Sequence, residues 1–297
     1  MNTFKPMLAV SCHDLNLVRY PVLVSWKIDG IRILIKDGVA LSRSLKPIPN
    51  LFIQNWVACN AEILNGLDGE LIVGDIDAPN VFNVTTSAVM SRDGEMDFTF
   101  YIFDKWDSPD TAMDRWLYLR NSDLQSKLPK RAKVLQKQLV HDAEQAAKYE
   151  ERLLSQGAEG MMICGCNTTY KYGRSTLKEQ KLLKKKNFVD SEFEVVGFIE
   201  KLHNANEAKI NEVGNTERSS HKENMIPMNT LGALTIKIWD GSLCNVGTGF
   251  DDLTRQHIWD NQEHYLGKLA KVKHFPVGAK DSLRFPVFLA FRHEDDM

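Results

Sequence analysis

Two short runs of apolar and β-branched residues lie near the start of the chain, and a lysine stands between them. Residues 22–26 and 31–36 each have the composition of a β-strand, and Lys27 directly follows the first run. Gly30 permits backbone conformations that other residues avoid, so the segment between the runs predicts a tight connection. Asp37-Gly38 then predicts a hairpin turn into a third strand. The sequence therefore predicts a sheet in which Lys27 lies between two strands.

The rest of the first two thirds of the chain mixes both kinds of secondary structure. Apolar residues fall on one helical face over 53–64, and a second helix is predicted over 143–156. Short apolar runs predict three buried strands, at 71–73, 98–103 and 161–164. This mixture predicts an α+β first domain. We place that domain at residues 1–189.

The composition changes after Asn187. A strand is predicted over 192–199, and the stretch 203–230 that follows has few apolar residues, so it predicts a long loop that is poorly ordered on its own. Alternation of apolar and polar residues over 234–238 predicts the next strand. Further strands are predicted over 243–246, 269–274 and 286–292. We therefore predict an all-β second domain over 190–297, a small barrel with one long loop.

Bulk composition limits the class of protein. A length of 297 residues exceeds the commonest domain size, which favours two domains. We find neither an apolar run long enough to span a membrane nor a secretory signal, so we expect an intracellular protein. The five cysteines lack framework spacing and are expected to be reduced thiols. Because the formal net charge is -2, any polyanion would have to be held by locally clustered cations.

The segment from Lys27 to Arg32 could support nucleophilic chemistry. A lysine attacks phosphorus only as the neutral amine, and partial burial together with nearby positive charge favours that form. Gly30 would let the backbone come close to a phosphate. The alternative is that Lys27 is an ordinary exposed turn residue, and so short a match does not decide between the two interpretations.

Further blocks follow this segment in a fixed order along the chain. The full set is Lys27–Arg32, Ser42–Arg43, Asp68–Leu71, Tyr101–Asp104, Glu159–Ile163 and Leu182–Lys186. Together they resemble the covalent nucleotidyltransferase superfamily of ATP-dependent DNA ligases, RNA ligases and mRNA capping enzymes. A single block often matches by chance, whereas an ordered series does not. The resemblance implies an α+β nucleotidyltransferase (ATP-grasp-like ligase) domain followed by an all-β OB-fold barrel.

The resemblance also implies roles for residues of the first domain. Lys27 would attack ATP and become adenylated, while Lys184 and Lys186 would contact the α-phosphate and help to expel pyrophosphate. Glu159 and Asp29 would bind the catalytic Mg²⁺ or Mn²⁺, and Asp29 would lie near the 3′-hydroxyl of nicked DNA. The other nucleotide-binding residues would be Ser25 facing the adenine amino group, Trp26 and Ile28 beside the lysine, Arg32 at the phosphates, Arg43 reaching the nick phosphate, Glu70 on a ribose hydroxyl and Phe103 stacked on adenine.

The resemblance continues through the second domain. Residues 231–234, 247–251, 265–268 and 284–288 resemble the OB-fold domain of DNA ligases, and 291–295 resembles the carboxyl end of a minimal two-domain viral member. In that member a long loop closes as a latch around nicked duplex, and its counterpart here is 203–230. The resemblance assigns DNA phosphates to Lys209, Arg218 and Lys222, and pyrophosphate to Arg284 and Arg292.

The function implied is that of an ATP-dependent DNA ligase that seals nicks in duplex DNA with a divalent metal. We expect a monomer that clamps around DNA, encoded by a virus or phage and acting in the host cell. The alternatives are an RNA ligase, a capping guanylyltransferase, which labelling by GTP rather than ATP would establish, or a nucleic-acid-binding protein that kept the fold without catalysis. The latch has its own alternative, a disordered insertion. Its glutamates also offset its lysines and arginine, which departs from a simple electrostatic clamp.

Overall fold

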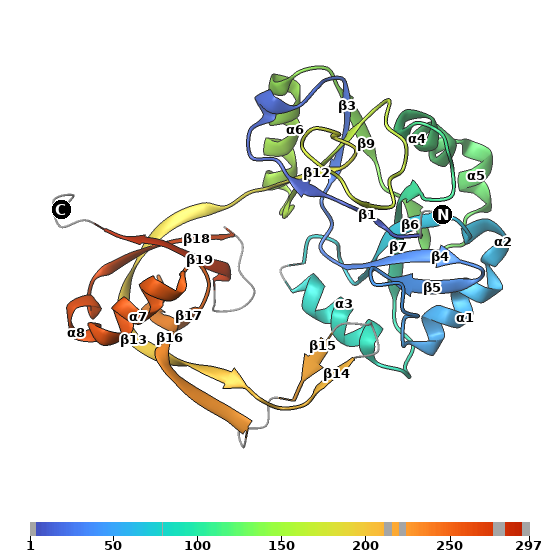
Figure 1. The fold of residues 1–297 in the computed structure, drawn as a ribbon. Helices are drawn as coiled ribbons and strands as arrows, with labels where there is room; N and C mark the ends of the chain where they lie inside the picture. Colours follow the sequence, from blue (N-terminus) through green and yellow to red (C-terminus); the bar gives the residue numbers. More distant parts are fainter. Residues whose placement is uncertain (1–3, 79, 211–215, 220–223, 276–282, 293–297) are drawn as a thin grey trace. The chain divides into compact units, whose positions relative to one another are not determined.

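The computed structural model describes residues 4–78, 80–210, 216–219, 224–275 and 283–292 (Figure 1). The chain divides into two compact units between Lys186 and Asn187. The domain limits of 1–189 and 190–297 stay a prediction. In the described part of the chain, no helix has both the length and the apolar character needed to cross a membrane.

The first unit contains two five-stranded sheets. One sheet has the strand order β2-β12-β10-β3-β9, and the other has the order β5-β4-β6-β7-β8. The strands of the first sheet are β2 (Val10–Ser11), β3 (Val22–Trp26), β9 (Lys137–Val140), β10 (Gly160–Gly165) and β12 (Leu183–Lys186). Those of the second are β4 (Ile31–Lys36), β5 (Val39–Ser42), β6 (Leu67–Val73), β7 (Phe98–Lys105) and β8 (Ala132–Val134). A separate parallel pair joins β1 (Met7–Leu8) to β11 (Gly173–Arg174).

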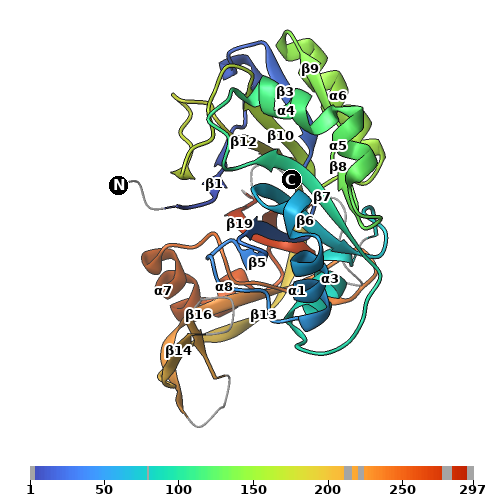
Figure 2. The same cartoon turned by 90° about the vertical axis from the view of Figure 1, so that its right-hand side faces the viewer.

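Helices cover the outer faces of both sheets (Figures 1 and 2). Helix α6 (Ala143–Ser155) packs Ala146 and Leu153 into the core of the first sheet, and Asp142 caps its first turn by accepting a hydrogen bond from the Gln145 amide. Helix α1 (Leu51–Cys59) packs Ile53 and Val57 against the second sheet. The remaining helical segments of this unit are η1 (Leu15–Leu17), α2 (Ala61–Leu64), α3 (Val81–Met90), α4 (Ala112–Arg120) and α5 (Ser122–Lys127).

The second unit is a β-rich domain. Its sheet has the order β17-β16-β13-β18-β19, and the Phe288 amide donates to the Thr248 carbonyl oxygen at 2.9 Å, which links the last strand to the segment after β17. The strands are β13 (Val189–Asn204), β16 (Met225–Lys237), β17 (Leu243–Val246), β18 (Leu269–Phe275) and β19 (Arg284–Phe291), with a separate pair β14 (Ala208–Ile210) and β15 (Thr216–Arg218). The helices are α7 (Asp252–Asp260) and α8 (Gln262–Tyr265).

Several element predictions need correction. The predicted helix over 53–64 is two helices, because Asn60 ends α1 and precedes α2. The second unit is β-rich as predicted, and it also contains α7, which begins where Asp251 accepts a hydrogen bond from the Thr254 amide. The predicted loop 203–230 contains β-structure, with β13 extending to Asn204 and β16 beginning at Met225. Backbone pairing between β13 and β16 holds these residues in β-structure, although they lack the apolar residues on which the strand predictions depended.

Candidate active site in the first unit

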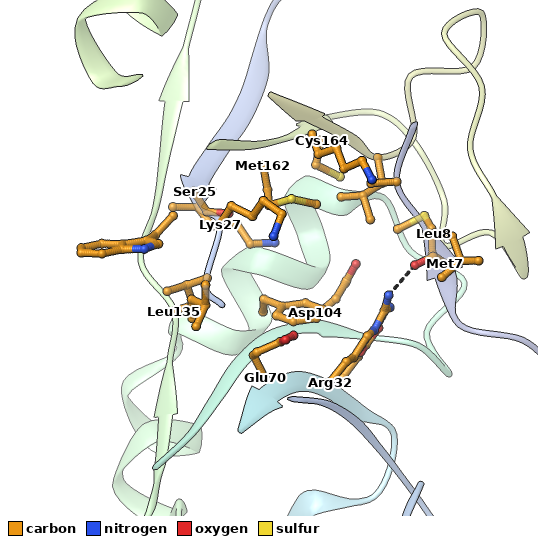
Figure 3. Close-up of a pocket in the computed structure, with 18 of the residues that line it drawn as sticks. Met7, Leu8, Ser25, Lys27, Arg32, Glu70, Asp104, Leu135, Met162 and Cys164 are labelled. Atoms are coloured by element: carbon orange, nitrogen blue, oxygen red, sulfur yellow. Dashed lines mark hydrogen bonds and ion pairs between the residues drawn. The ribbon is translucent and has the colours of Figure 1, made fainter. Parts of the chain in front are cut away.

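A pocket of about 350 Å³ lies between the two sheets of the first unit (Figure 3). One wall comes from β3, β10 and β12 with Lys27, and the opposite wall comes from β4, β6 and β7. Ser25 and Lys27 face the pocket from one side, with Glu70 and Arg32 on the other. The short connection between β3 and β4 predicted from Gly30 thus joins one sheet to the other, and it brings Lys27 and Arg32 into the same pocket.

Lys27 is held at the end of β3 by both its backbone and its side chain. Its amide donates to the Gly160 carbonyl oxygen at 3.0 Å, and its ammonium pairs with Oε2 of Glu159. The other carboxylate oxygen of Glu159 lies 2.7 Å from Nζ of Lys186. Burial alone would raise the pKa of Glu159, but these two ammonium groups outweigh it and hold the pKa below its usual range. Glu159 therefore remains an anion between two cations.

Strand β12 directs its lysines alternately. Lys184 and Lys186 line the pocket, whereas Lys185 pairs with both carboxylate oxygens of Glu150 on α6 at 2.8 Å. Burial, together with the positive charges of Lys186, Lys27 and Arg174, lowers the pKa of Lys184. The cluster would therefore favour an anionic ligand.

The opposite wall contains a buried polar network around Arg32. Its Nε donates to Oδ1 of Asp68 at 2.9 Å, and its Nη2 lies 2.5 Å from Oδ2 of the same carboxylate. The Tyr170 hydroxyl donates to Oδ2 of Asp68 at 2.7 Å, and Nη1 of Arg32 donates to the Met7 carbonyl oxygen at 2.6 Å. The guanidinium also lies 5.4 Å from the ring centre of Phe103. These contacts fix the orientation of Arg32.

Glu70 faces the pocket beside Arg32, opposite it in the β4–β6 register. Burial raises the pKa of Glu70 to about 7, although Lys27 and Arg32 oppose the shift. The folded state therefore binds a proton on Glu70 more tightly than the unfolded chain does. The contribution of Glu70 to the free energy of unfolding is therefore smallest at high pH, and it increases as pH falls from about 7 towards 4.5.

We expect Glu70→Gln to gain stability relative to the wild-type protein as pH rises from 5 to 8. The difference in the free energy of unfolding between the two proteins should change by about 1–3 kcal/mol over this range, because glutamine has no charge to desolvate. Urea unfolding of both proteins at the two pH values measures this quantity. A difference that stays constant with pH would show that the Glu70 carboxyl titrates normally.

Most of the predicted site residues meet at this pocket. Those that line it are Ser25, Trp26, Lys27, Ile28, Arg32, Arg43, Glu70, Phe103, Lys184 and Lys186. Glu159 joins them through its two ion pairs. Asp29, in the loop after Lys27, is not among the described residues that line the pocket.

The other predicted residues belong to the second unit. Lys209 is exposed on β14, and Arg218 on β15 donates to the Asn206 carbonyl oxygen. Nη1 of Arg292 lies 2.8 Å from Oε2 of Glu192, and the Arg284 guanidinium lies 5.7 Å from the ring centre of Phe275. The prediction for Lys222 lies outside the described residues. The roles of all these residues remain predictions.

Sequence reasoning missed several residues of the pocket and its supporting network. Arg174 and Lys137 line the pocket, and Asp68 and Tyr170 hold Arg32. Asp68 and Arg174 stand inside conspicuous motifs, Asp68-Gly69-Glu70 and Tyr172-Gly173-Arg174, which could have drawn attention to them. Lys137 and Tyr170 carry no such local signal.

Comparison with known proteins agrees with this combination of a nucleotidyltransferase domain and an OB-fold domain. The model of the ATP dependent DNA ligase domain matches residues 6–186, and that of the DNA ligase OB-like domain matches residues 227–292. The chain therefore belongs to the family of ATP-dependent DNA ligases, the enzymes that seal nicks in duplex DNA with ATP as substrate.

Solved structures give the same answer. A Chlorella virus DNA ligase-adenylate is 33% identical, with 98% of this chain and 99% of that chain covered and a TM-score of 0.56. A Lig E DNA ligase, described as binding DNA with a minimal scaffold, shares the fold at 22% identity and a TM-score of 0.69, with 98% of this chain and 100% of that chain covered. No curated protein sequence matches the chain significantly.

Proposed function

We propose that the pocket of the first unit is the adenylation site of this ligase and that Lys27 is its nucleophile. The observation that carries the proposal is the position of the Lys27 amine, which pairs with Glu159 at a pocket that also contains Lys184, Lys186 and Arg32. Such a pocket combines a lysine nucleophile with fixed cations that stabilise negative charge on phosphate.

The adenylation step forms one bond and breaks another. Nζ of Lys27, after losing a proton, attacks the α-phosphorus of ATP, and pyrophosphate leaves with the electrons of the broken phosphoanhydride bond. Lys184 and Lys186 would stabilise the charge that builds up on the α-phosphate. The 5′-phosphate at a nick would next take the AMP, and the 3′-hydroxyl would then displace AMP to form the phosphodiester.

The remaining pocket residues would bind the nucleotide. Phe103 would stack on the adenine, Glu70 would accept a hydrogen bond from the ribose, and Ser25 would face the 6-amino group. Arg43 would reach the nick phosphate when DNA is bound. Trp26, Ile28 and Arg32 would shape the site around Lys27.

The donor set fits a magnesium ion that is held mainly by substrate. Mg²⁺ often takes one or two protein carboxylates together with phosphate oxygens, and Glu159 is a carboxylate kept ionised at the pocket. Within the described residues, no three His, Cys, Asp or Glu side chains gather as a metal site. We propose that Glu159 and Asp29 would hold Mg²⁺ or Mn²⁺, which would neutralise phosphate charge.

The second unit would supply contacts to pyrophosphate and DNA. Arg284 and Arg292 would orient pyrophosphate, and Lys209, Arg218 and Lys222 would contact DNA phosphates from a latch within 203–230. The enzyme would act as a monomer that closes around nicked duplex. We also propose that it is encoded by a virus and acts inside a host cell, as the similarity to the Chlorella virus enzyme along nearly the whole chain suggests.

Sealing of a nicked duplex tests the proposed function directly. We expect purified protein with ATP and Mg²⁺ to join a 5′-labelled oligonucleotide of ~20 nucleotides to a neighbour of the same length across the nick. The product, of twice that length, is measured on a denaturing gel. Placing RNA on either side of the nick distinguishes a DNA ligase from an RNA ligase. Sealing only at RNA ends would contradict the assignment.

A further inference from the structure

Four side chains form one row across the pocket face of the first sheet. In the strand registers Lys137 lies opposite Ser25, Ser25 opposite Met162, and Met162 opposite Lys184. All four line the pocket, and Figure 3 shows Ser25 and Met162 on the same wall as Lys27. Side chains opposite one another on neighbouring strands share a face of the sheet. A lysine therefore stands at each end of the row.

The two lysines lie in different surroundings. Lys184 belongs to the cationic cluster, because the charges of Lys186 and Lys27 help to lower its pKa. Lys137 lies on the other side of Ser25, on β9, about three strand spacings or ~14 Å from Lys184 across the sheet. A nucleotide whose α-phosphate meets Lys27 and Lys184 would thus direct its base towards Ser25, Met162 and Lys137.

Lys137 differs in its pairing from three other pocket cations, Lys27, Lys186 and Arg32. Lys27 and Lys186 share Glu159, and Arg32 is paired with Asp68. Lys137 is half-buried, and its ammonium makes no ion pair or hydrogen bond with any residue that the structure describes. A cation placed in a pocket without a protein acceptor is available to a ligand acceptor.

We propose that Lys137 determines base specificity by donating a hydrogen bond to N1 of adenine; this rests on the proposed function of the pocket. The Ser25 hydroxyl would accept from the 6-amino group. Adenine offers an acceptor at N1 beside a donor at the 6-amino group, which matches this pair. Guanine carries a hydrogen on N1, and the Lys137 ammonium, which can only donate, would oppose it. Lys137 would therefore favour ATP and reject GTP.

Nucleotide analogues that differ at one ring atom test this contact. In 1-deaza-ATP a C–H group replaces N1, whereas 7-deaza-ATP keeps N1 and serves as the control nucleotide. We expect wild-type adenylation to lose about tenfold to a hundredfold in kcat/KM with 1-deaza-ATP, as for a lost hydrogen bond to a charged donor. In Lys137→Met the same replacement should cost less than about twofold.

Matched variants keep the experiment specific to Lys137. Lys133→Met, at an exposed lysine on the nearby strand β8, should retain the wild-type penalty for 1-deaza-ATP. Lys137→Arg keeps a cationic donor and should retain most of that penalty. In every variant, 7-deaza-ATP should be used in the same ratio to ATP as in the wild-type protein.

A penalty for 1-deaza-ATP that is the same in wild type and in Lys137→Met would overturn the proposal. So would equal use of ATP and 1-deaza-ATP by the wild-type protein. Failure of the proposed function looks different, because then wild-type protein would form no lysine-linked AMP from ATP at all.

Discussion

Replacing Lys27 with alanine should abolish transfer of AMP from α-labelled ATP to the protein. The reaction requires the Lys27 amine as the atom that bonds to phosphorus, and no methyl group can take its place. The expected loss is about 10⁴-fold or more in the rate of label transfer. The fold should survive, since Glu159 keeps its ion pair with Lys186 at 2.7 Å.

A gel assay for protein-bound label measures the effect, and intact-mass analysis locates the AMP. Lys148→Ala, an exposed lysine on α6, provides the matched control and should label like the wild-type protein. Lys27→Ala should still seal a nick whose 5′ end already carries AMP, because that last step does not need the Lys27 amine as nucleophile. Persistent lysine-linked AMP in Lys27→Ala would refute the assignment.

The position of Lys27 at the pocket was predictable because its signal is local. Lys27 stands between two strand-forming runs, and the following glycine and arginine complete a recognisable block. The blocks around Glu70, Glu159 and Lys184 are likewise short and continuous, and strand alternation alone sends Lys184 and Lys186 to one face. In the structure, all of these blocks contribute to one site in the first unit.

The supporting residues were not predictable because their partners lie far away in sequence. Tyr170 reaches Asp68 across a separation of 102 residues, and Lys137 meets Ser25 only through the pairing of β9 with β3. Neither side chain has a distinguishing neighbour in the sequence. Tertiary contacts alone give these residues their places.

The segment 203–230 shows a different limit of sequence reasoning. Its polar composition predicts a loop, yet β13 and β16 extend into it from both ends. His203 pairs with Ile226 in that extension, where both side chains are exposed. A strand pair that buries little apolar surface leaves no alternating pattern in the sequence, because backbone hydrogen bonds form whatever the side chains are.

Replacing Asp68 with leucine should cost about 3–5 kcal/mol of stability. The Asp68 side chain is fully buried and accepts hydrogen bonds from Arg32 and Tyr170. Its loss leaves the guanidinium of Arg32, whose side chain is only 14% exposed, without its anion. Urea unfolding measures this cost. A loss below ~1 kcal/mol would show that water or another group solvates Arg32 in the variant.

The double variant Arg32→Leu/Asp68→Leu separates stability from chemistry. Removing the unpaired Arg32 guanidinium should restore much of the stability that Asp68→Leu loses, because replacing a buried ion pair by apolar side chains is often neutral. Adenylation should nevertheless stay at least about 100-fold below wild type, since Arg32 lines the pocket beside Glu70. If the double variant were stable and also fully active, Arg32 and Asp68 would form a structural pair without a role at the phosphates.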